Sequence, residues 1–221
     1  MAKRLLILVM MTVVAVWADE FTYALNSDHC TGGCGTIPFG TVDVKAIGSG
    51  AGGAGEVQVT VSLIPGDSFV STGFPGSFGF NLVSPFNQTV TLSNFSAGFG
   101  TAGTQSPGSF QFDGFGNFQY FVTCISCGSG GSSPNQGPLV FDVTETGLLA
   151  ADFAQLSSLP PGSQQAFFVA DIMGSNGLTG PVGAVSPGVP VGSVPEPTST
   201  VSLGALIISI LYIFRRRQQL Q

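Results

Sequence analysis

Basic residues are scarce in this sequence. Lysine and arginine number six in 221 residues, and the range 19–193 holds only one of them, Lys45, against eleven acidic residues. That range therefore carries a formal charge of −10. A surface of this sign is repelled by phosphate backbones and anionic headgroups, which argues against a nucleic-acid partner.

Histidine is almost absent, because His29 is the only one. Ser-His-Asp catalysis needs a histidine base that is held by a third group and reaches a nucleophile. A single histidine beside a cysteine is more typical of a loop residue. The acidic residues lie in no glycoside-hydrolase motif, and most fall at expected strand edges and turns. We therefore predict no catalytic residue, no cofactor and no enzymatic activity.

Long apolar runs occur only at the two ends of the chain. Near the N-terminus, two basic residues precede an apolar stretch over 5–16, and Val16-Trp17-Ala18 forms a small-residue cleavage pattern. This order predicts a signal peptide over 1–18, with a mature chain that begins near Asp19. An uncleaved anchor is the alternative, although roughly a dozen apolar residues are short for a membrane span.

The range 19–175 suits one domain with a real core. Short runs that alternate apolar and polar residues, rich in β-branched and aromatic side chains, are separated by Gly, Pro, Ser and Asn clusters, a pattern typical of β-strands. We expect an all-β fold, an antiparallel β-sandwich or jelly-roll-like domain. The expected strands are 41–47, 56–64, 77–83, 89–95, 109–125, 138–144 and 164–173, of which the first two form a hairpin.

Two further segments differ from this pattern. "TGLLAADFAQLSSLPPG" places apolar residues near helical spacing before Pro160-Pro161, which predicts one short helix that caps the sandwich. The range 176–193 turns to Gly, Pro, Val and Ser without periodicity. We interpret it as a linker between the domain and the membrane.

Four cysteines lie in two close pairs, Cys30 with Cys34 and Cys124 with Cys127. In a cytosolic chain this spacing would indicate a four-thiolate zinc site. An exported chain meets an oxidising compartment, which favours disulfides over zinc. Three pairings are possible, and we favour the two local ones because each closes a turn of Gly- or Ser-containing sequence. The cross-pairing stays open.

The segment "FDGFGN" offers oxygen ligands at Asp113 and Asn117. It lacks the Asp-rich spacing and the closing Glu of an EF-hand, so we interpret it as a hairpin turn and predict no metal site. A calcium ion at Asp113 and Asn117 is the alternative.

The C-terminal apolar run covers 198–214 and is long enough to cross a thin bilayer as a helix. Arg215, Arg216 and Arg217 follow it directly and place its far end on the cytoplasmic side. The prediction is a transmembrane helix that holds the body outside the cytoplasm, followed by a cytoplasmic tail over 218–221. An ordinary C-terminal anchor is one interpretation.

Val194-Pro195-Glu196-Pro197 comes directly before this helix. The order of motif, span and arginine cluster over 194–217 resembles the PEP-CTERM sorting signal of bacterial exported proteins. The resemblance implies that an integral-membrane exosortase recognises the Pro-Glu-Pro motif and processes the tail, in organisms that make extracellular polysaccharide and biofilm. It makes Pro195, Glu196 and Pro197 recognition residues of a substrate and gives them no catalytic role.

The body also resembles a common exported domain of PEP-CTERM proteins, on "TVDVKAIGSG", "EVQVTVSL", "GSFGFNL", "CGSGGSSPNQGPLVFDVT" and "FFVADIMGSNGLTGPVGA". That resemblance carries no activity. We expect an exported, exosortase-processed component of the cell surface or extracellular matrix, associated with biofilm or extracellular polysaccharide. The alternatives are a binding module for extracellular glycan or calcium, and a secreted hydrolase. A glycan module should expose aromatic side chains on a sheet face or edge.

Overall fold

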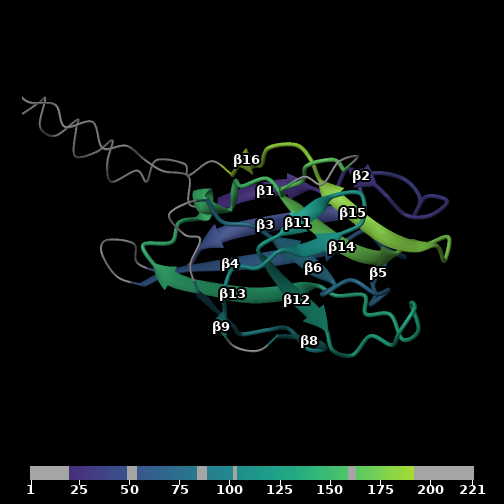
Figure 1. Cartoon of the computed structure of the whole chain (residues 1–221), viewed down its shortest axis with the longest axis horizontal. Coiled ribbons are helices and arrows are strands. Elements are labelled where there is room, and N and C mark those ends of the chain that lie inside the picture. The colour runs from purple at the N-terminus through teal and green to yellow at the C-terminus, as the bar shows by residue number, and fades with distance from the viewer. Residues whose placement is uncertain (1–19, 49–53, 84–88, 102–103, 159–162, 192–221) are drawn as a thin grey trace, which may run out of the picture. The chain divides into compact units, whose positions relative to one another are not determined.

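The computed structural model describes residues 20–48, 54–83, 89–101, 104–158 and 163–191 (Figure 1). These residues form an all-β fold in which every pairing between named strands is antiparallel. In this part of the chain, no helix has the length and apolar character to span a membrane. The expected signal peptide, transmembrane helix and sorting motif lie outside the described residues.

The first sheet has seven strands in the order β16-β1-β3-β4-β13-β7-β9. The β3–β4 hairpin expected from the sequence is confirmed, with Val42 opposite Val61 and Val44 opposite Val59. Valine at alternate positions sends these side chains to one face, where they are fully buried. The bounds are β1 Glu20–Ala24, β3 Gly40–Ala46, β4 Ala54–Leu63, β7 Val90–Ser93, β9 Thr104–Gln105, β13 Leu139–Thr146 and β16 Val189–Pro190.

The second sheet has the order β2-β15-β14-β6-β12-β8, and β5 also pairs with β14. Its strands alternate in the same way: in β12, Tyr120, Val122 and Cys124 are buried while Phe121 and Thr123 are half-buried. The bounds are β2 Ser27–Asp28, β5 Ser68–Phe69, β6 Phe78–Phe80, β8 Phe99–Gly100, β12 Tyr120–Cys124, β14 Phe168–Met173 and β15 Thr179–Ala184.

The main hydrophobic core lies between the two sheets, which makes the fold sandwich-like. Phe141 of β13 contacts Phe80 of β6 with ring centroids 5.7 Å apart, and Tyr23 of β1 contacts Phe168 of β14 at 4.8 Å. Tilted and edge-to-face rings at these distances add to the stabilisation from burial alone.

A second, smaller core lies on the outer face of the second sheet. The hairpin of β10 (Phe110–Phe112) and β11 (Gly116–Phe118) supplies three of its phenylalanines, which pack on Val169 of β14. Val169 points away from the main core because it alternates with Phe168 and Ala170, which belong to that core. The hairpin therefore forms a third layer over part of the sandwich.

One ion pair joins neighbouring strands of the first sheet. The Lys45 ammonium of β3 lies 3.5 Å from a carboxylate oxygen of Glu20 in β1, directly opposite in the register. The lysine side chain is 56% exposed, so solvent screens the pair and its contribution to stability is small.

The expected short helix is a single turn of 3-10 helix, η1, over Ala150–Phe153. Only part of the predicted apolar stripe is buried: Leu148 and Phe153 face the core, whereas Leu149 is 42% exposed. The turn is held at its start by Asp152, whose carboxylate accepts the backbone N–H of Leu149 at 2.7 Å.

The prediction that 176–193 is a linker is wrong for most of that range. Thr179–Ala184 forms β15, which pairs with β14 over six residues, and Val182 and Ala184 are fully buried. Val189–Pro190 forms β16 at the edge of the first sheet. The expected domain boundary at residue 175 therefore falls inside the sandwich. The two glycines and one proline of β15 interrupt the strand pattern in its sequence, and neighbouring segments bury the strand.

Two valines of this range allow a direct test. We expect Val182→Asp, which buries an unpaired carboxylate, to lower the free energy of unfolding by about 3 kcal/mol or more. Val189→Asp on exposed β16 is the matched control and should change it by no more than about 0.5 kcal/mol. Urea denaturation of both variants measures the difference. Equal stability of the two variants would restore the linker interpretation.

Candidate functional site

The cysteines form the two local disulfides favoured from the sequence, Cys30–Cys34 and Cys124–Cys127, with Cα atoms 5.5 Å and 5.3 Å apart. No free cysteine occurs among the described residues. Zinc binds thiolates, so the oxidised pairs do not provide the four-thiolate site considered above. Both disulfides fit an oxidising compartment.

Asp28 organises the first disulfide loop. Its two carboxylate oxygens accept the backbone N–H groups of Cys30 and Cys34, each at 2.8 Å. In the part of the chain that the structure describes, these three residues are the one group of three acidic, histidine or cysteine side chains close enough to share a metal ion. The Asp28 carboxylate already accepts hydrogen bonds from the loop, and the two sulfurs form a disulfide. The three residues therefore have a structural role.

The residues considered for calcium lie at different hollows. Asp113 is exposed in the turn between β10 and β11, which confirms the hairpin interpretation, and it lines a small hollow with Phe74 and Gln111. Asn117 lies on β11 and lines another, larger pocket. His29 is exposed and packs edge-to-face on Phe115, with centroids 4.6 Å apart. It serves as a packing residue of the outer core.

Three buried carboxylates belong to separate hydrogen-bond networks. Asp142 accepts the side-chain amides of Gln58 and Asn94 at 3.1 and 2.6 Å. Asp67 accepts the backbone N–H of Ser175 at 2.9 Å, while its other oxygen has no partner. Burial raises the pKa of Asp67, and that hydrogen bond opposes the shift.

The third buried carboxylate, Asp171, lies on the outer face of β14. Both of its oxygens accept hydrogen bonds from Thr72, one of them from the backbone N–H at 2.7 Å. Burial raises the pKa of Asp171 to about 6, and the Thr72 hydrogen bonds oppose the shift. The side chain is fully buried, so the carboxylate ties a loop to the sheet and does not face a cleft.

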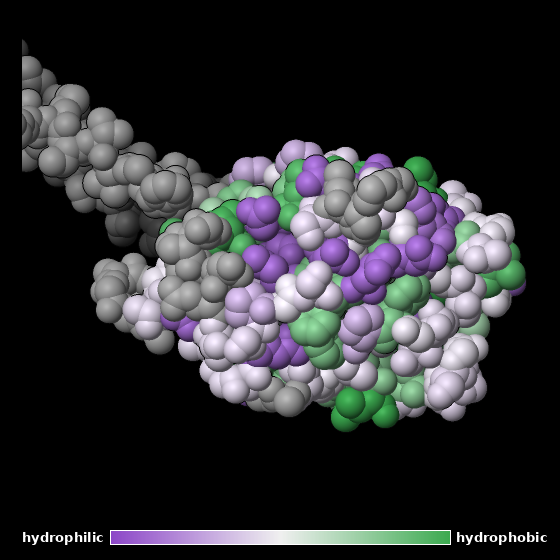
Figure 2. Space-filling view, viewed as in Figure 1, coloured by the Kyte–Doolittle hydropathy of each residue, from purple (hydrophilic) through white to green (hydrophobic). Residues whose placement is uncertain are grey.

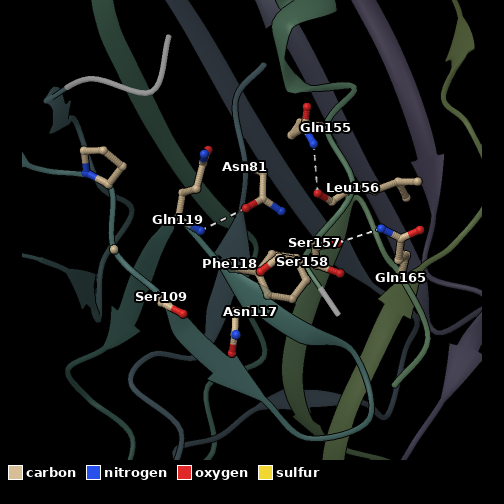
Figure 3. A pocket seen from close by; sticks show the side chains of 12 residues that line it. Asn81, Ser109, Asn117, Phe118, Gln119, Gln155, Leu156, Ser157, Ser158 and Gln165 are labelled. Atoms are coloured by element: carbon tan, nitrogen blue, oxygen red, sulfur yellow. Dashed lines mark hydrogen bonds between the residues drawn. The ribbon is translucent and has the colours of Figure 1, made fainter. Parts of the chain in front are cut away.

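Convergent polar groups line a pocket of about 560 Å³ beside β11 (Figure 3). We call it the amide pocket, because five of its side chains are amides and three are hydroxyls. No charged residue is among the described residues that line it. Its polar residues are Asn81, Asn117, Gln119, Gln155, Gln165, Ser109, Ser157 and Ser158. Its volume falls in the range of small-molecule sites, about 300–1,000 Å³.

Local structure brings these residues together from separate segments. Asn81 follows β6, and Gln119 lies between β11 and β12. The segment 155–158 joins β11 through a bridge in which Asn117 and Ser158 exchange backbone hydrogen bonds of 2.8 and 3.0 Å. Ser157 is fully buried, and its hydroxyl donates to the carbonyl of Phe115 at 2.6 Å. The floor of the pocket is therefore rigidly built.

Among the described residues of the pocket, Asn81 is the one with a buried side-chain polar atom that lacks a hydrogen-bond partner. Its side-chain oxygen accepts the backbone N–H of Gln119 at 2.9 Å, but its amide nitrogen has no hydrogen-bond partner, although the residue is only 2% exposed. Figure 3 shows this nitrogen on the side facing the segment 155–158. A buried donor without a partner costs about 1–3 kcal/mol, which marks this position as unusual.

No protein-family model, curated protein or solved structure matches this chain. The site must therefore be interpreted from its own chemistry. The amide pocket can donate and accept hydrogen bonds without offering charge, a nucleophile paired with a base, or a metal-binding carboxylate. Such a surface suits binding of an uncharged polar molecule.

Sequence reasoning did not identify the amide pocket. Its side chains come from five separate segments between residues 81 and 165, none of which carries a motif. Glutamine and asparagine in turns also have an ordinary explanation as solvated loop residues. The one local signal was the density of amides in "GNFQ" and "GSQQ", which is weak by itself.

First, exported protein should contain no free thiol and no stoichiometric zinc, because all four cysteines are paired. Alkylation under denaturing conditions, before and after reduction, followed by mass measurement, checks this. Labelling of four cysteines without reduction would contradict the disulfides and favour bound zinc.

The second prediction concerns Asp171. Its pKa is about 6 in the folded chain and about 3.9 unfolded, so the folded state binds the proton more tightly. This group's contribution to stability is therefore fully present below pH ~4 and falls by up to about 3 kcal/mol as pH rises to ~6. In urea unfolding, Asp171→Asn should flatten the dependence of the free energy of unfolding on pH across that range. Asp113→Asn, in the exposed turn, is the control. Identical slopes in wild type and Asp171→Asn would contradict it.

Proposed function

We propose that this chain is an exported, non-enzymatic component of the cell surface or extracellular matrix. In this proposal the signal peptide over 1–18 directs export, and an exosortase reads Pro195-Glu196-Pro197 and processes the tail. The body then associates with biofilm or extracellular polysaccharide. The observation that carries the proposal is the pair of local disulfides in an acidic all-β body, which fits an oxidising compartment outside the cytoplasm.

The arrangement of the buried acids supports a non-enzymatic role. A glycosidase needs two carboxylates that face one cleft about 5–10 Å apart. Here Asp67, Asp142 and Asp171 each accept hydrogen bonds from their own structural partners. Nothing in these networks favours the secreted-hydrolase alternative.

One observation favours a binding module as the second candidate. The amide pocket is uncharged, rich in hydrogen-bonding groups and large enough for a small ligand. Calcium has no comparable support, because Asp113 and Asn117 line different hollows. Exposed aromatic side chains, expected for a glycan module, are missing from the described residues: Phe110 and Phe121 are only half-exposed and pack edge-to-face at 4.5 Å.

Tail processing is the central test of the proposed function. Two prolines around Glu196 keep the motif extended and out of the following helix, and Arg215 to Arg217 resist transfer across the bilayer. In a host with an exosortase, the mature protein should therefore lose its arginine tail. Intact-mass measurement of the sorted protein gives the result.

Two controls separate processing from simple anchoring. Glu196→Ala, or deletion of the exosortase, should leave a larger form in the membrane fraction. Sorted wild-type protein that still carries residues 215–221 would refute processing and leave an ordinary C-terminal anchor.

A further inference from the structure

The unpaired donor in the amide pocket has a fixed orientation. The backbone N–H of Gln119 can only donate, so the atom of Asn81 that faces it at 2.9 Å must be the oxygen. Rotating the amide to use its nitrogen elsewhere would place two donors against each other. The NH₂ group is therefore held toward the pocket side, where no protein acceptor meets it.

Other polar atoms of the pocket are also available. Gln155 and Gln165 use their side-chain nitrogens in hydrogen bonds to the carbonyls of Leu156 and Ser157, at 3.1 and 2.9 Å. Their side-chain oxygens accept no hydrogen bond within the described part of the chain, and these amides are half-buried or exposed. The pocket thus combines a donor at its floor with acceptors and hydroxyls nearer its mouth.

We propose that the amide pocket binds a neutral saccharide. A sugar hydroxyl both donates and accepts, so hydroxyls of one sugar can donate to the amide oxygens of Gln155 and Gln165. The Asn81 donor is too buried for direct contact and would be reached through one bound water. Small apolar surfaces from Leu156 and Pro107 line the same pocket and suit the C–H faces of a sugar ring. The proposal names the ligand class of the binding-module alternative and rests on the proposed location outside the cell.

Charge and strand pairing argue against the other ligand classes. Among the described residues, no cationic side chain lines the pocket, and the body is strongly acidic, which disfavours anionic polysaccharides and phosphates. No carboxylate of this part of the chain lines the pocket to pair with a cation. An extended peptide binds by adding to a free strand edge, but the edge of β11 at Asn117 is already paired with Ser158.

The test uses the full-length chain, purified in a detergent without a sugar headgroup because a glycoside detergent would compete. Short neutral oligomers of glucose, galactose and mannose are titrated in turn, with oligogalacturonate as the anionic comparison and an uncharged extended peptide as the third probe. Amide correlations in NMR report binding, and the Asn81 side-chain signal is assigned by its absence in Asn81→Asp. We expect one neutral saccharide to shift the Asn81 and Asn117 side-chain signals.

Matched variants locate the site. Ser109 is exposed at the pocket, so Ser109→Trp should fill it, while Thr36→Trp places the same ring in an exposed loop elsewhere. Ser109→Trp and Gln155→Ala should each weaken binding about tenfold or more, and Thr36→Trp should leave it unchanged. Gln155 is half-buried and its one side-chain hydrogen bond goes to the carbonyl of the next residue, so Gln155→Ala removes no contact between separate segments and folding is retained.

Three outcomes would overturn the proposal: no saccharide shifts the Asn81 signal at millimolar concentration, Ser109→Trp binds as tightly as wild type, or oligogalacturonate or the peptide binds in place of the neutral sugars. Each concerns binding by purified protein. Export and tail processing are measured separately in the host, so failure of this proposal and failure of the proposed function are distinguishable.

Discussion

The packing of aromatic rings between the two sheets is the interaction on which the other features depend. Phe141 from the first sheet contacts Phe78 and Phe80 from the second, with centroids 6.0 and 5.7 Å apart. Side chains alternate along a strand, so Gly79 faces outward because Phe78 and Phe80 on either side of it face the core. The β10–β11 hairpin packs at this glycine, where a Cβ would lie 2.8 Å from the Phe112 ring. The main core thus sets the position of the third layer.

The amide pocket lies where this third layer ends. Figure 2 shows hydrophilic side chains gathered in a band over the region of β11 and β15 in Figure 1, while hydrophobic side chains form small separate patches. Phe118 of β11 belongs to the outer core and also lines the pocket, and its neighbour Asn117 lies on the opposite face of the strand. Polar groups gather at this boundary, where two of them, Asn81 and Ser157, are buried.

Sequence patterns predicted those strands in which the alternation of apolar and polar residues itself decides which side chains are buried. Valines at alternate positions in β3 and β4 anticipated the hairpin and its buried face. Sequence patterns did not predict strands whose burial depends on neighbouring strands. β15 has the sequence "TGPVGA", and it is buried only because it pairs with β14. The stripe near η1 looked helical, yet only four residues form a turn. The fold brings Asn81, Gln119 and Gln155 together from separate segments, so no local sequence pattern could predict that they share a pocket.

The scarcity of basic residues has a consequence for proteolysis. Lys45 is the only lysine or arginine between residues 20 and 191, so a protease of trypsin-like specificity has one cleavage point in the whole body. That point lies in β3, which pairs with β1 on one side and β4 on the other. A protease needs an extended, unpaired segment, and freeing Lys45 requires separating the end of β3 from both β1 and β4. Scarcity of basic residues therefore leaves a protease of this specificity little to cut in the folded body.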